Sequence, residues 1–388
     1  MDWMNQALQQ RRKQTLFREA KVTKRLSSTL VEINGQTLVN FGANDYLGLS
    51  WSSAEHSKNC CPVTIGSGAA PLLSGYSEHH AALESSIADF ESSEAAIVFS
   101  TGYAANVGTI SAVAQEGDLL LSDSLNHASL IDGCRLSKAK SIVYPHSDMQ
   151  AVHQILSQHR SQFKRCYLAT DTLFSMNGDL AKLLEIVSLA ETFDMAVIVD
   201  EAHATGIYGK NGRGWVEECG LEKQIAIRIG TLSKAIGSVG GFAHGSQVLV
   251  DYLRNFARTY VYSTSMPEWV AISTKSNLAR LSSMSRERTI LRSKSSDLRH
   301  RLQVAGFQVE SGDSPIIPIR MESAEIAVDR SNRLREFGFY IPAIRPPTIP
   351  ADQSMLRVSL SIDHTEEQIK SLINSLSPNS AGVAQATR

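Results

Sequence analysis

The sequence predicts an α/β fold with a mostly parallel sheet flanked by helices. Six short apolar runs read as strands, and helical periodicity separates most of them. The expected strands are 95–100, 119–123, 141–144, 166–171, 195–201 and 225–230, with helical periods between them, for example at 148–159 and 183–192. Strands that alternate with helices are typical of a parallel sheet covered on both faces.

The remaining segments predict the domain organisation. We expect an N-terminal helix (5–20) and β segment (37–41), followed by the large domain. A long charged helix from 284 to about 304 opens a smaller α/β domain with strands at 316–321 and 356–360 and helices at 324–337 and 366–376. The expected divisions are 1–45 (N-terminal segment), 46–283 (large domain), 284–378 (small C-terminal domain) and 379–388 (disordered tail).

Composition narrows the class of protein. The 388 residues are 43% hydrophobic and 20% charged, with a formal net charge of −1, so we expect neither nucleic acid nor a membrane as a partner. Five scattered cysteines, among them the adjacent Cys60 and Cys61, predict neither a disulfide framework nor a zinc site. The first residues lack the apolar stretch of a signal peptide, and we expect a cytoplasmic protein.

Lys234 and Asp200 carry the main chemical signal. Lys234 lies in the run Gly-Thr-Leu-Ser-Lys-Ala-Ile-Gly (230–237), and Asp200 lies near the end of an expected strand. Such a lysine can hold an aldehyde cofactor as a Schiff base, and such an aspartate can hold a proton on the cofactor's ring nitrogen. The structural alternatives are a loop lysine and a helix N-cap or ion-pair partner. Together the two residues predict a site for pyridoxal 5'-phosphate (PLP).

A turn at Gly102 and Tyr103 follows the first strand and starts a helix. Backbone N–H groups at a helix N-terminus bind phosphate, and glycine lets the chain approach closely. Such turns are also common without a ligand, and Tyr103 could simply belong to the core. The turn is therefore a candidate phosphate site.

Three further polar residues follow expected strands. His127 opens a helix, where an imidazole could stack on a pyridine ring or merely cap the helix. Ser175 lies in a tight turn, and His203 follows Asp200 by three residues, so both could reach the cofactor's phenolic oxygen. Asp-x-x-His is also a metal-like spacing, but no third ligand stands at a sensible distance, and we expect no metal.

Arg357 is a charge inside an apolar strand. A buried arginine requires a partner, and a planar guanidinium suits the carboxylate of an amino acid. A structural ion pair is the alternative.

Taken together, these runs resemble the α-oxoamine synthase family of fold-type I PLP-dependent enzymes. The resemblance covers roughly residues 3–376 and rests on motifs that arrive in the family's order. The motifs are Asn44-Asp45-Tyr46-Leu47-Gly48, Gly66-Ser67-Gly68, Ser74-Gly75, His127-Ala128-Ser129, Phe174-Ser175-Met176, Asp200 to Gly206, Gly212-Arg213-Gly214, Thr231 to Lys234 and Tyr262 to Pro267.

The resemblance implies roles for the candidate residues. The catalytic group is Lys234, His127, Asp200 and His203. Lys234 binds PLP covalently, Asp200 protonates the pyridine nitrogen and His127 stacks on the ring, while His203 and Ser175 approach the phenolic oxygen. The phosphate is held by Gly102, Tyr103 and Thr231, together with Thr264 from a partner subunit. Arg357 takes the amino-acid carboxylate, and the other substrate contacts are Arg18, Asn44, His127 and Thr348.

The resemblance also implies a reaction, a decarboxylative condensation of an amino acid with an acyl thioester. The N-terminal Ala7-Leu8 with Arg11-Arg12, and above all the segment 343–350, are similar to the biotin-pathway branch of the family. That branch joins L-alanine to pimeloyl-CoA or pimeloyl-acyl carrier protein, giving 8-amino-7-oxononanoate, in a homodimer with sites at the interface. Alternatives are a sister enzyme using glycine and acetyl-CoA, a paralogue with another acyl chain, an aminotransferase and a non-catalytic PLP-binding protein.

Three places depart from the family's pattern. Gly66-Ser67-Gly68 is followed by Ala69-Ala70-Pro71 instead of a further Gly-Ser, and Asp171 stands where a glutamate is common. The stretch 51–65 is polar and shows little sign of the expected helix. These departures bear on docking of the acyl donor rather than on the cofactor.

Overall fold

The computed structural model describes residues 1–52, 65–350 and 352–376. The chain forms two compact units. The larger comprises Leu49–Ser175 and Asp179–Arg288, and the smaller comprises Met1–Gly48, Met176–Gly178 and Thr289–Arg388. The expected tail at 379–388, Cys60, Cys61 and most of the stretch 51–65 lie outside the described residues.

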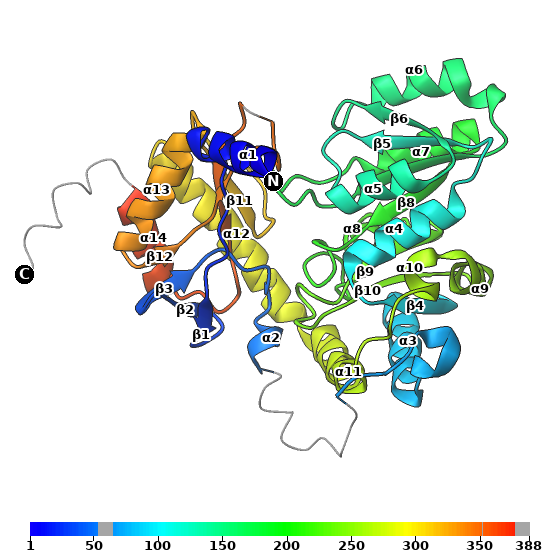
Figure 1. Cartoon of the computed structure of the whole chain (residues 1–388), viewed down its shortest axis with the longest axis horizontal. Helices are drawn as coiled ribbons and strands as arrows, with labels where there is room; N and C mark the ends of the chain where they lie inside the picture. The colour runs from blue at the N-terminus through cyan, green and yellow to red at the C-terminus, as the bar shows by residue number, and fades with distance from the viewer. Residues whose placement is uncertain (53–64, 351, 377–388) are drawn as a thin grey trace, which may run out of the picture. The chain divides into compact units, whose positions relative to one another are not determined.

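A seven-stranded sheet forms the centre of the larger unit, in the order β4-β10-β9-β8-β7-β5-β6 (Figure 1). Its strands are β4 (Ala95–Phe99), β5 (Leu119–Asp123), β6 (Lys140–Tyr144), β7 (Cys166–Asp171), β8 (Ala196–Asp200), β9 (Ile227–Thr231) and β10 (Gly241–Gly245). β10 runs antiparallel to both of its neighbours, and the other pairs from β9 to β6 are parallel. The predicted mostly parallel sheet is therefore confirmed. It also contains one antiparallel strand, β10, that was not predicted.

Helices cover this sheet on both faces, as alternate residues of β5 show. Leu120 packs in one buried apolar cluster, whereas Leu119 and Leu121 pack in another. Each such side chain contributes roughly 1.5–3 kcal/mol when it is fully buried. The helices of the larger unit are α2 (Leu49–Ser52), α3 (Glu78–Glu91), α4 (Gly102–Val113), α5 (Ala128–Leu136), α6 (Met149–His159), α7 (Leu183–Phe193), α8 (Trp215–Cys219), α9 (Gln247–Phe256), α10 (Arg258–Val261) and α11 (Glu268–Ser283), with a π-helical turn at Pro71–Gly75 and a 3-10 turn at Arg160–Gln162.

The smaller unit contains two small sheets. One has the order β1-β2-β3-β12, and the other has the antiparallel order β11-β14-β13. Their strands are β1 (Thr23–Arg25), β2 (Leu30–Ile33), β3 (Gln36–Asn40), β11 (Ile316–Arg320), β12 (Phe339–Tyr340), β13 (Ala343–Ile344) and β14 (Met355–Ser359). The helices are α1 (Asp2–Lys13), α13 (Ala324–Glu336) and α14 (Glu366–Leu376), while α12 (Ser285–Val304) spans residues of both units.

One helix differs from its predicted form, and one strand was not predicted. The N-terminal helix ends at Lys13 rather than near residue 20, and none of its residues is buried. β10 was missed because its sequence, Gly-Phe-Ala-His-Gly, has glycines at both ends and resembles a turn.

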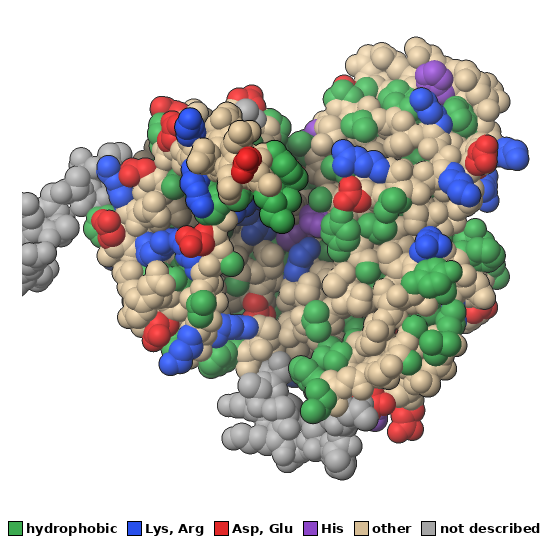
Figure 2. Space-filling model, viewed as in Figure 1, with side chains coloured by type: hydrophobic (Ala, Val, Ile, Leu, Met, Phe, Trp, Pro, Cys, Tyr) green, Lys and Arg blue, Asp and Glu red, His purple; other side chains and the backbone are tan. Residues whose placement is uncertain are grey.

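The surface carries charges of both signs. Lysine and arginine side chains are interspersed with aspartate and glutamate on the face drawn in Figure 2, in keeping with 38 basic and 39 acidic residues. Within the described ranges, no helix is long and apolar enough to cross a membrane.

Candidate active site

The candidate cofactor residues of the larger unit follow the carboxyl ends of its strands. Gly102 comes after β4, His127 after β5, Ser175 after β7, His203 after β8 and Lys234 after β9. β4 and β9 both pair antiparallel with β10, so all five strands point the same way and end at one edge of the sheet. Ligands of open α/β sheets bind beyond this edge.

Asp200 is the last residue of β8 and is only 4% exposed. The side-chain nitrogen of Asn106 donates to its Oδ2 across 2.6 Å, and the backbone nitrogen of Ala202 donates to its Oδ1 across 2.7 Å. These two hydrogen bonds fix the orientation of the buried carboxyl group. Asp200 is therefore held in place at the end of β8, where the site residues gather.

The same Asn106 nitrogen also donates to Ser129 Oγ, 2.9 Å away. Ser129 Oγ lies 2.7 Å from Nδ1 of His127, and the Ser129 backbone nitrogen donates to that Nδ1 across 3.3 Å. His127 thus caps helix α5 as an acceptor, which confirms the structural alternative without excluding a cofactor role. Burial and the charge of Lys234 lower the pKa of His127, with partial compensation by Asp200. Its ring is therefore neutral near pH 7.

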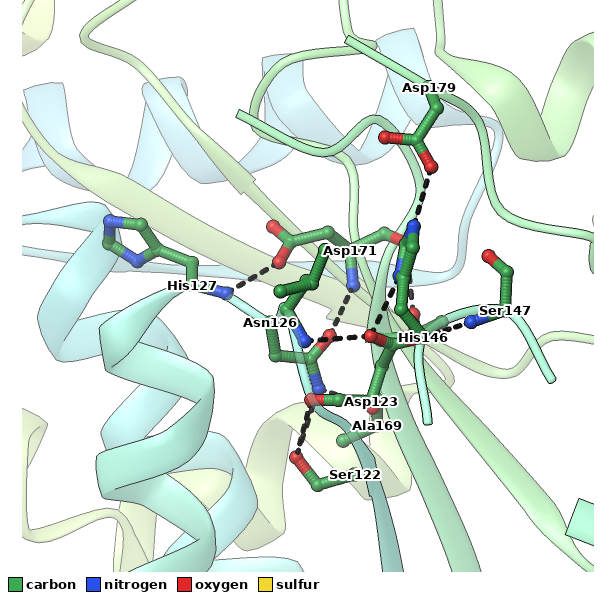
Figure 3. Close-up of polar contacts among 11 residues, drawn as sticks. Ser122, Asp123, Asn126, His127, His146, Ser147, Ala169, Asp171 and Asp179 are labelled. Atoms are coloured by element: carbon green, nitrogen blue, oxygen red, sulfur yellow. Dashed lines mark hydrogen bonds and ion pairs between the residues drawn. The ribbon is translucent and has the colours of Figure 1, made fainter. Parts of the chain in front are cut away.

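Asp171, the last residue of β7, lies beside Asp200 in the parallel register. Its Oδ2 accepts from the backbone nitrogen of His127 across 2.7 Å, as Figure 3 shows. Burial and the neighbouring Asp200 carboxylate raise the pKa of Asp171 well above its usual value. The residue that departs from the family's glutamate thus holds the backbone of the histidine expected to stack on the cofactor.

Gly102 faces Thr231 at the candidate phosphate cradle. A Cβ at Gly102 would lie 3.0 Å from Thr231 Oγ1, so a side chain there would fill the space. Thr101 caps helix α4 by accepting from the Ala104 nitrogen, and the first backbone N–H groups of the helix, at Gly102 and Tyr103, have no intrahelical acceptor. Tyr103 is 45% exposed, so the alternative of a core residue is wrong.

The other predicted cofactor residues have less distinctive surroundings. Lys234 is partly buried in the turn between β9 and β10, and its charge helps to lower the pKa of His127 and opposes the rise in the pKa of Asp171. His203 is 5% exposed and Ser175 is partly buried, each in the turn after its strand. Thr264 is exposed in the loop after α10.

The altered segment 66–71 is held against the loop that carries Thr264. Ser67 Oγ donates to the carbonyl oxygen of Met266, and the backbone nitrogen of Ser265 donates to that of Ala69 across 3.1 Å. Substitutions in this segment therefore act next to Thr264.

Arg357 lies in β14 of the smaller unit and is 4% exposed. One guanidinium nitrogen, NH1, donates to Asn44 Oδ1 across 3.1 Å and to Ser359 Oγ across 2.8 Å. Tyr46, fully buried nearby, also donates to Asn44 Oδ1. The structure thus brings two predicted substrate residues, Arg357 and Asn44, into direct contact.

Arg18 and Thr348 form a second pair in the smaller unit. A guanidinium nitrogen of Arg18 donates to Thr348 Oγ1 across 2.8 Å and to the carbonyl oxygen of Arg345. Both side chains are exposed, and they join the N-terminal segment to the segment 343–350. The segment 343–350, which favours the biotin-pathway branch, is therefore in contact with Arg18.

The residues of the larger unit fit PLP. A cradle with free backbone N–H groups suits the phosphate, an oriented buried carboxylate suits the pyridine nitrogen, and a lysine amine suits the aldehyde. In the described part of the chain, no group of three or more His, Cys, Asp or Glu side chains could hold a metal ion.

Asn106, which joins Asp200 to the His127 cap, was not predicted from the sequence. A signal was available, because Asn106 lies four residues after Gly102 and therefore on the same face of the helix. Its partner Asp200 lies 94 residues away, so only the folded chain shows the pairing.

Comparisons with known proteins identify the family of the chain. The model of the family "Aminotransferase class I and II" matches residues 36–376. An 8-amino-7-oxononanoate synthase of Lysinibacillus sphaericus is 39% identical over 97% of both chains.

Two solved structures have the same fold. The serine palmitoyltransferase of Sphingomonas wittichii is 31% identical, with a TM-score of 0.89 over 96% of this chain and 95% of that one. A structure of SPT with a PLP internal aldimine is 30% identical, with a TM-score of 0.89 over 96% of each chain. The chain therefore belongs to the aminotransferase class I and II family, in the α-oxoamine synthase branch that contains the 8-amino-7-oxononanoate synthases.

Proposed function

We propose that this chain is a PLP-dependent acyltransferase that condenses L-alanine with a pimeloyl thioester. The products are 8-amino-7-oxononanoate, an intermediate of biotin biosynthesis, with CO2 and the free thiol carrier. The observation that carries the proposal is the 39% identity to an 8-amino-7-oxononanoate synthase over 97% of both chains. The Asp200–Asn106–Ser129–His127 network supports the cofactor, since it orients the groups that PLP chemistry needs.

PLP bound at this site supplies an electron sink for the electron pair left at Cα of the amino acid. Asp200 holds a proton at the ring nitrogen, and its two hydrogen bonds, from Asn106 and Ala202, keep the carboxylate in place. The neutral ring of His127 can stack there without adding a second positive charge. Asn106 and Ala202 thus orient Asp200, and His127 adds no charge beside the ring.

Lys234 is the group that moves the proton at Cα of the amino acid. With PLP bound, Lys234 would hold its aldehyde, and the Lys234 Nζ, when it is a free amine, would be the base that takes the proton from Cα of the amino acid. The same amine returns a proton to Cα after CO2 has left. Ser175 and His203 hydrogen-bond at the phenolic oxygen, and Gly102, Tyr103 and Thr231 bind the phosphate.

Arg357 binds the alanine carboxylate in this proposal, because a planar guanidinium pairs with a carboxylate through two parallel hydrogen bonds. Asn44 orients the guanidinium by accepting from it. Arg18 and Thr348 contact the acyl substrate. The thioester is carried by CoA or by acyl carrier protein.

The proposal includes a homodimer, with Thr264 contributing to the partner subunit's phosphate site. Its exposure in a polar loop supports this assignment. We also propose a cytoplasmic location, supported by free thiols at Cys134, Cys166 and Cys219.

A second candidate is a related synthase with another amino acid or acyl chain. The TM-score of 0.89 to a serine palmitoyltransferase favours it, and the altered segment 66–71 is the place where acyl preference could change. The sister enzyme that uses glycine and acetyl-CoA is one of these related synthases.

Thiol release by the PLP-loaded protein tests these candidates. L-alanine, glycine and L-serine are each paired with pimeloyl-CoA, acetyl-CoA and palmitoyl-CoA. Release that requires alanine and pimeloyl-CoA supports the proposal. A clear preference for serine with palmitoyl-CoA, or for glycine with acetyl-CoA, replaces it with the second candidate.

A further inference from the structure

His146 lies between two carboxylates at the edge of the sheet that carries the candidate cofactor residues. Its Nδ1 is 2.9 Å from Asp123 Oδ1, and its Nε2 is 2.7 Å from Asp179 Oδ2. Figure 3 shows the ring bridging the two acids. Ionised carboxylates only accept hydrogen bonds, so the ring donates from both nitrogens as an imidazolium. The imidazole is 23% exposed and Asp123 only 2%, which limits screening by water.

Asp123 connects the imidazolium to the loop that carries His127. It ends β5, and its Oδ1 also accepts from the backbone nitrogen of Leu125 across 2.8 Å. Its Oδ2 accepts from the backbone nitrogen of Ser147, next to His146. One buried carboxylate thus ties the His146 loop to the start of the His127 loop.

The rest of the His127 loop is held from the neighbouring strand β7. Asn126 donates to the carbonyl oxygen of Ala169 across 2.8 Å and accepts from the backbone nitrogen of Asp171. The Asp171 carboxylate then accepts from the backbone nitrogen of His127. Asp123, Leu125, Asn126 and His127 are thus all partners in this network, and a shift of Asp123 moves the loop that ends at His127.

Asp179 connects the imidazolium to the turn that carries Ser175. The backbone nitrogen of Phe174 donates to the carbonyl oxygen of Asp179 across 2.9 Å, which closes the turn. The ring of Phe174 meets the His146 ring edge-on, with centroids 4.5 Å apart. His146 therefore contacts both ends of the Ser175 turn, one through an ion pair and the other through its ring.

We propose that His146 is a positioning residue that fixes the His127 loop and the Ser175 turn together through its bridge between Asp123 and Asp179. This inference rests on the proposed function, in which His127 and Ser175 face the cofactor. His146 acts through the two carboxylates, and charge-assisted hydrogen bonds are roughly twice as strong as neutral ones. Loss of the imidazolium leaves Asp123 buried without its cation, so the loop rearranges to reach water or another donor.

His146→Gln tests the bridge, because a glutamine amide can donate to only one of the two acids. His244→Gln is the matched control. His244 is more deeply buried than His146 and lies 3.6 Å from the carboxyl group of Glu91, but it is near the amino end of β4 in the register, at the opposite edge of the sheet. Both variants are loaded with PLP, and the visible circular dichroism of the bound cofactor, kcat, KM for alanine and the thermal midpoint are measured.

Positioning predicts a changed cofactor dichroism and a kcat lower by about 10- to 100-fold in His146→Gln, since misplacement by about 1 Å costs up to about 100-fold. His244→Gln keeps the dichroism and kcat and loses only stability. If His146→Gln behaves like His244→Gln, with an unchanged dichroism and kcat, the bridge is only structural and the inference is wrong.

If His146→Gln does not fold, Asp179→Asn tests the inference instead. It keeps the shape of the side chain and the His146–Asp123 pair, and removes only the charge on the Ser175 side. An altered dichroism supports the inference, and an unaltered one overturns it. The dichroism requires PLP alone, so it remains a test of the bridge even if the wild-type protein fails to turn over alanine and pimeloyl-CoA, an outcome that would refute the proposed function instead.

Discussion

Asn106 donates a hydrogen bond to Asp200 across 2.6 Å, and both side chains are buried. Because the same nitrogen reaches Ser129 Oγ, one amide joins the aspartate at the end of β8 to the cap of helix α5. The orientation of the Asp200 carboxylate therefore depends on a helix that begins at the phosphate cradle. The Asn106 side chain thus links three elements of the candidate cofactor site: helix α4, the end of β8 and the start of helix α5.

Asn106→Ala is expected to lower the free energy of unfolding of the cofactor-free protein by about 1.5–3 kcal/mol, the usual value of a hydrogen bond to a charged group. Thr109→Val is the control on the same helix, since the Thr109 hydroxyl is buried and accepts or donates no hydrogen bond within the described residues. Denaturant unfolding measures both variants. Equal stability of the two would contradict the importance of the Asn106–Asp200 bond.

Lys234→Ala is expected to abolish the visible absorbance band that a lysine-bound PLP gives, because the amine that forms the bond is gone. Lys234→Arg keeps the positive charge but cannot form that bond, so it should lose the band as well. Absorption spectra of the dialysed, PLP-treated proteins provide the measurement. A retained band in either variant would assign the covalent bond to a different lysine.

Arg357→Met is expected to weaken alanine binding by about 2–5 kcal/mol, the cost of truncating one partner of a buried charge pair. Methionine fills a similar volume, so the effect reports the lost guanidinium rather than a cavity. Arg357→Lys retains the charge and should recover part of the affinity. Titration of the PLP-loaded variants with alanine, followed by absorbance, gives the dissociation constants, and unchanged binding in Arg357→Met would refute the carboxylate role.

The pH dependence of stability tests the charge on His146. Burial alone would lower the pKa of His146, but hydrogen bonds to Asp123 and Asp179 raise it to about 9. A pKa that is raised on folding gives stability that is fully present below the unfolded value of about 6.5 and is lost as the pH rises through about 9. The stability gap between wild type and His146→Gln should therefore shrink by at most about 3 kcal/mol over that range. A gap that does not change with pH would mean that the ring is neutral.

The sequence predicts the parts of the site that follow strands. Lys234, Asp200, His127 and Ser175 each stand just beyond or at the end of an apolar run, and a parallel sheet brings such ends to one edge. Strand β10 escaped prediction because its glycines serve packing rather than a turn. A Cβ at Gly241 would lie 2.5 Å from Gly102 Cα, so the residue must be small where the strand passes the cradle.

The contacts between site residues could not be predicted from the sequence. Asn106 and Asp200 are 94 positions apart, and His146 is 23 positions from Asp123 and 33 from Asp179. No local periodicity relates residues at such separations, because their contact depends on strand order, which tertiary packing determines. The positions of the candidate cofactor residues at the ends of strands were therefore predictable residue by residue, whereas the network that joins these residues was not.

The most direct test of the central claim is a single turnover balance with L-alanine labelled at its carboxyl carbon. The PLP-loaded protein is incubated with this alanine and pimeloyl-CoA, and labelled CO2, free thiol and 8-amino-7-oxononanoate are quantified together. A decarboxylative condensation predicts equal amounts of all three. Formation of labelled pyruvate, or thiol release without labelled CO2, would contradict it.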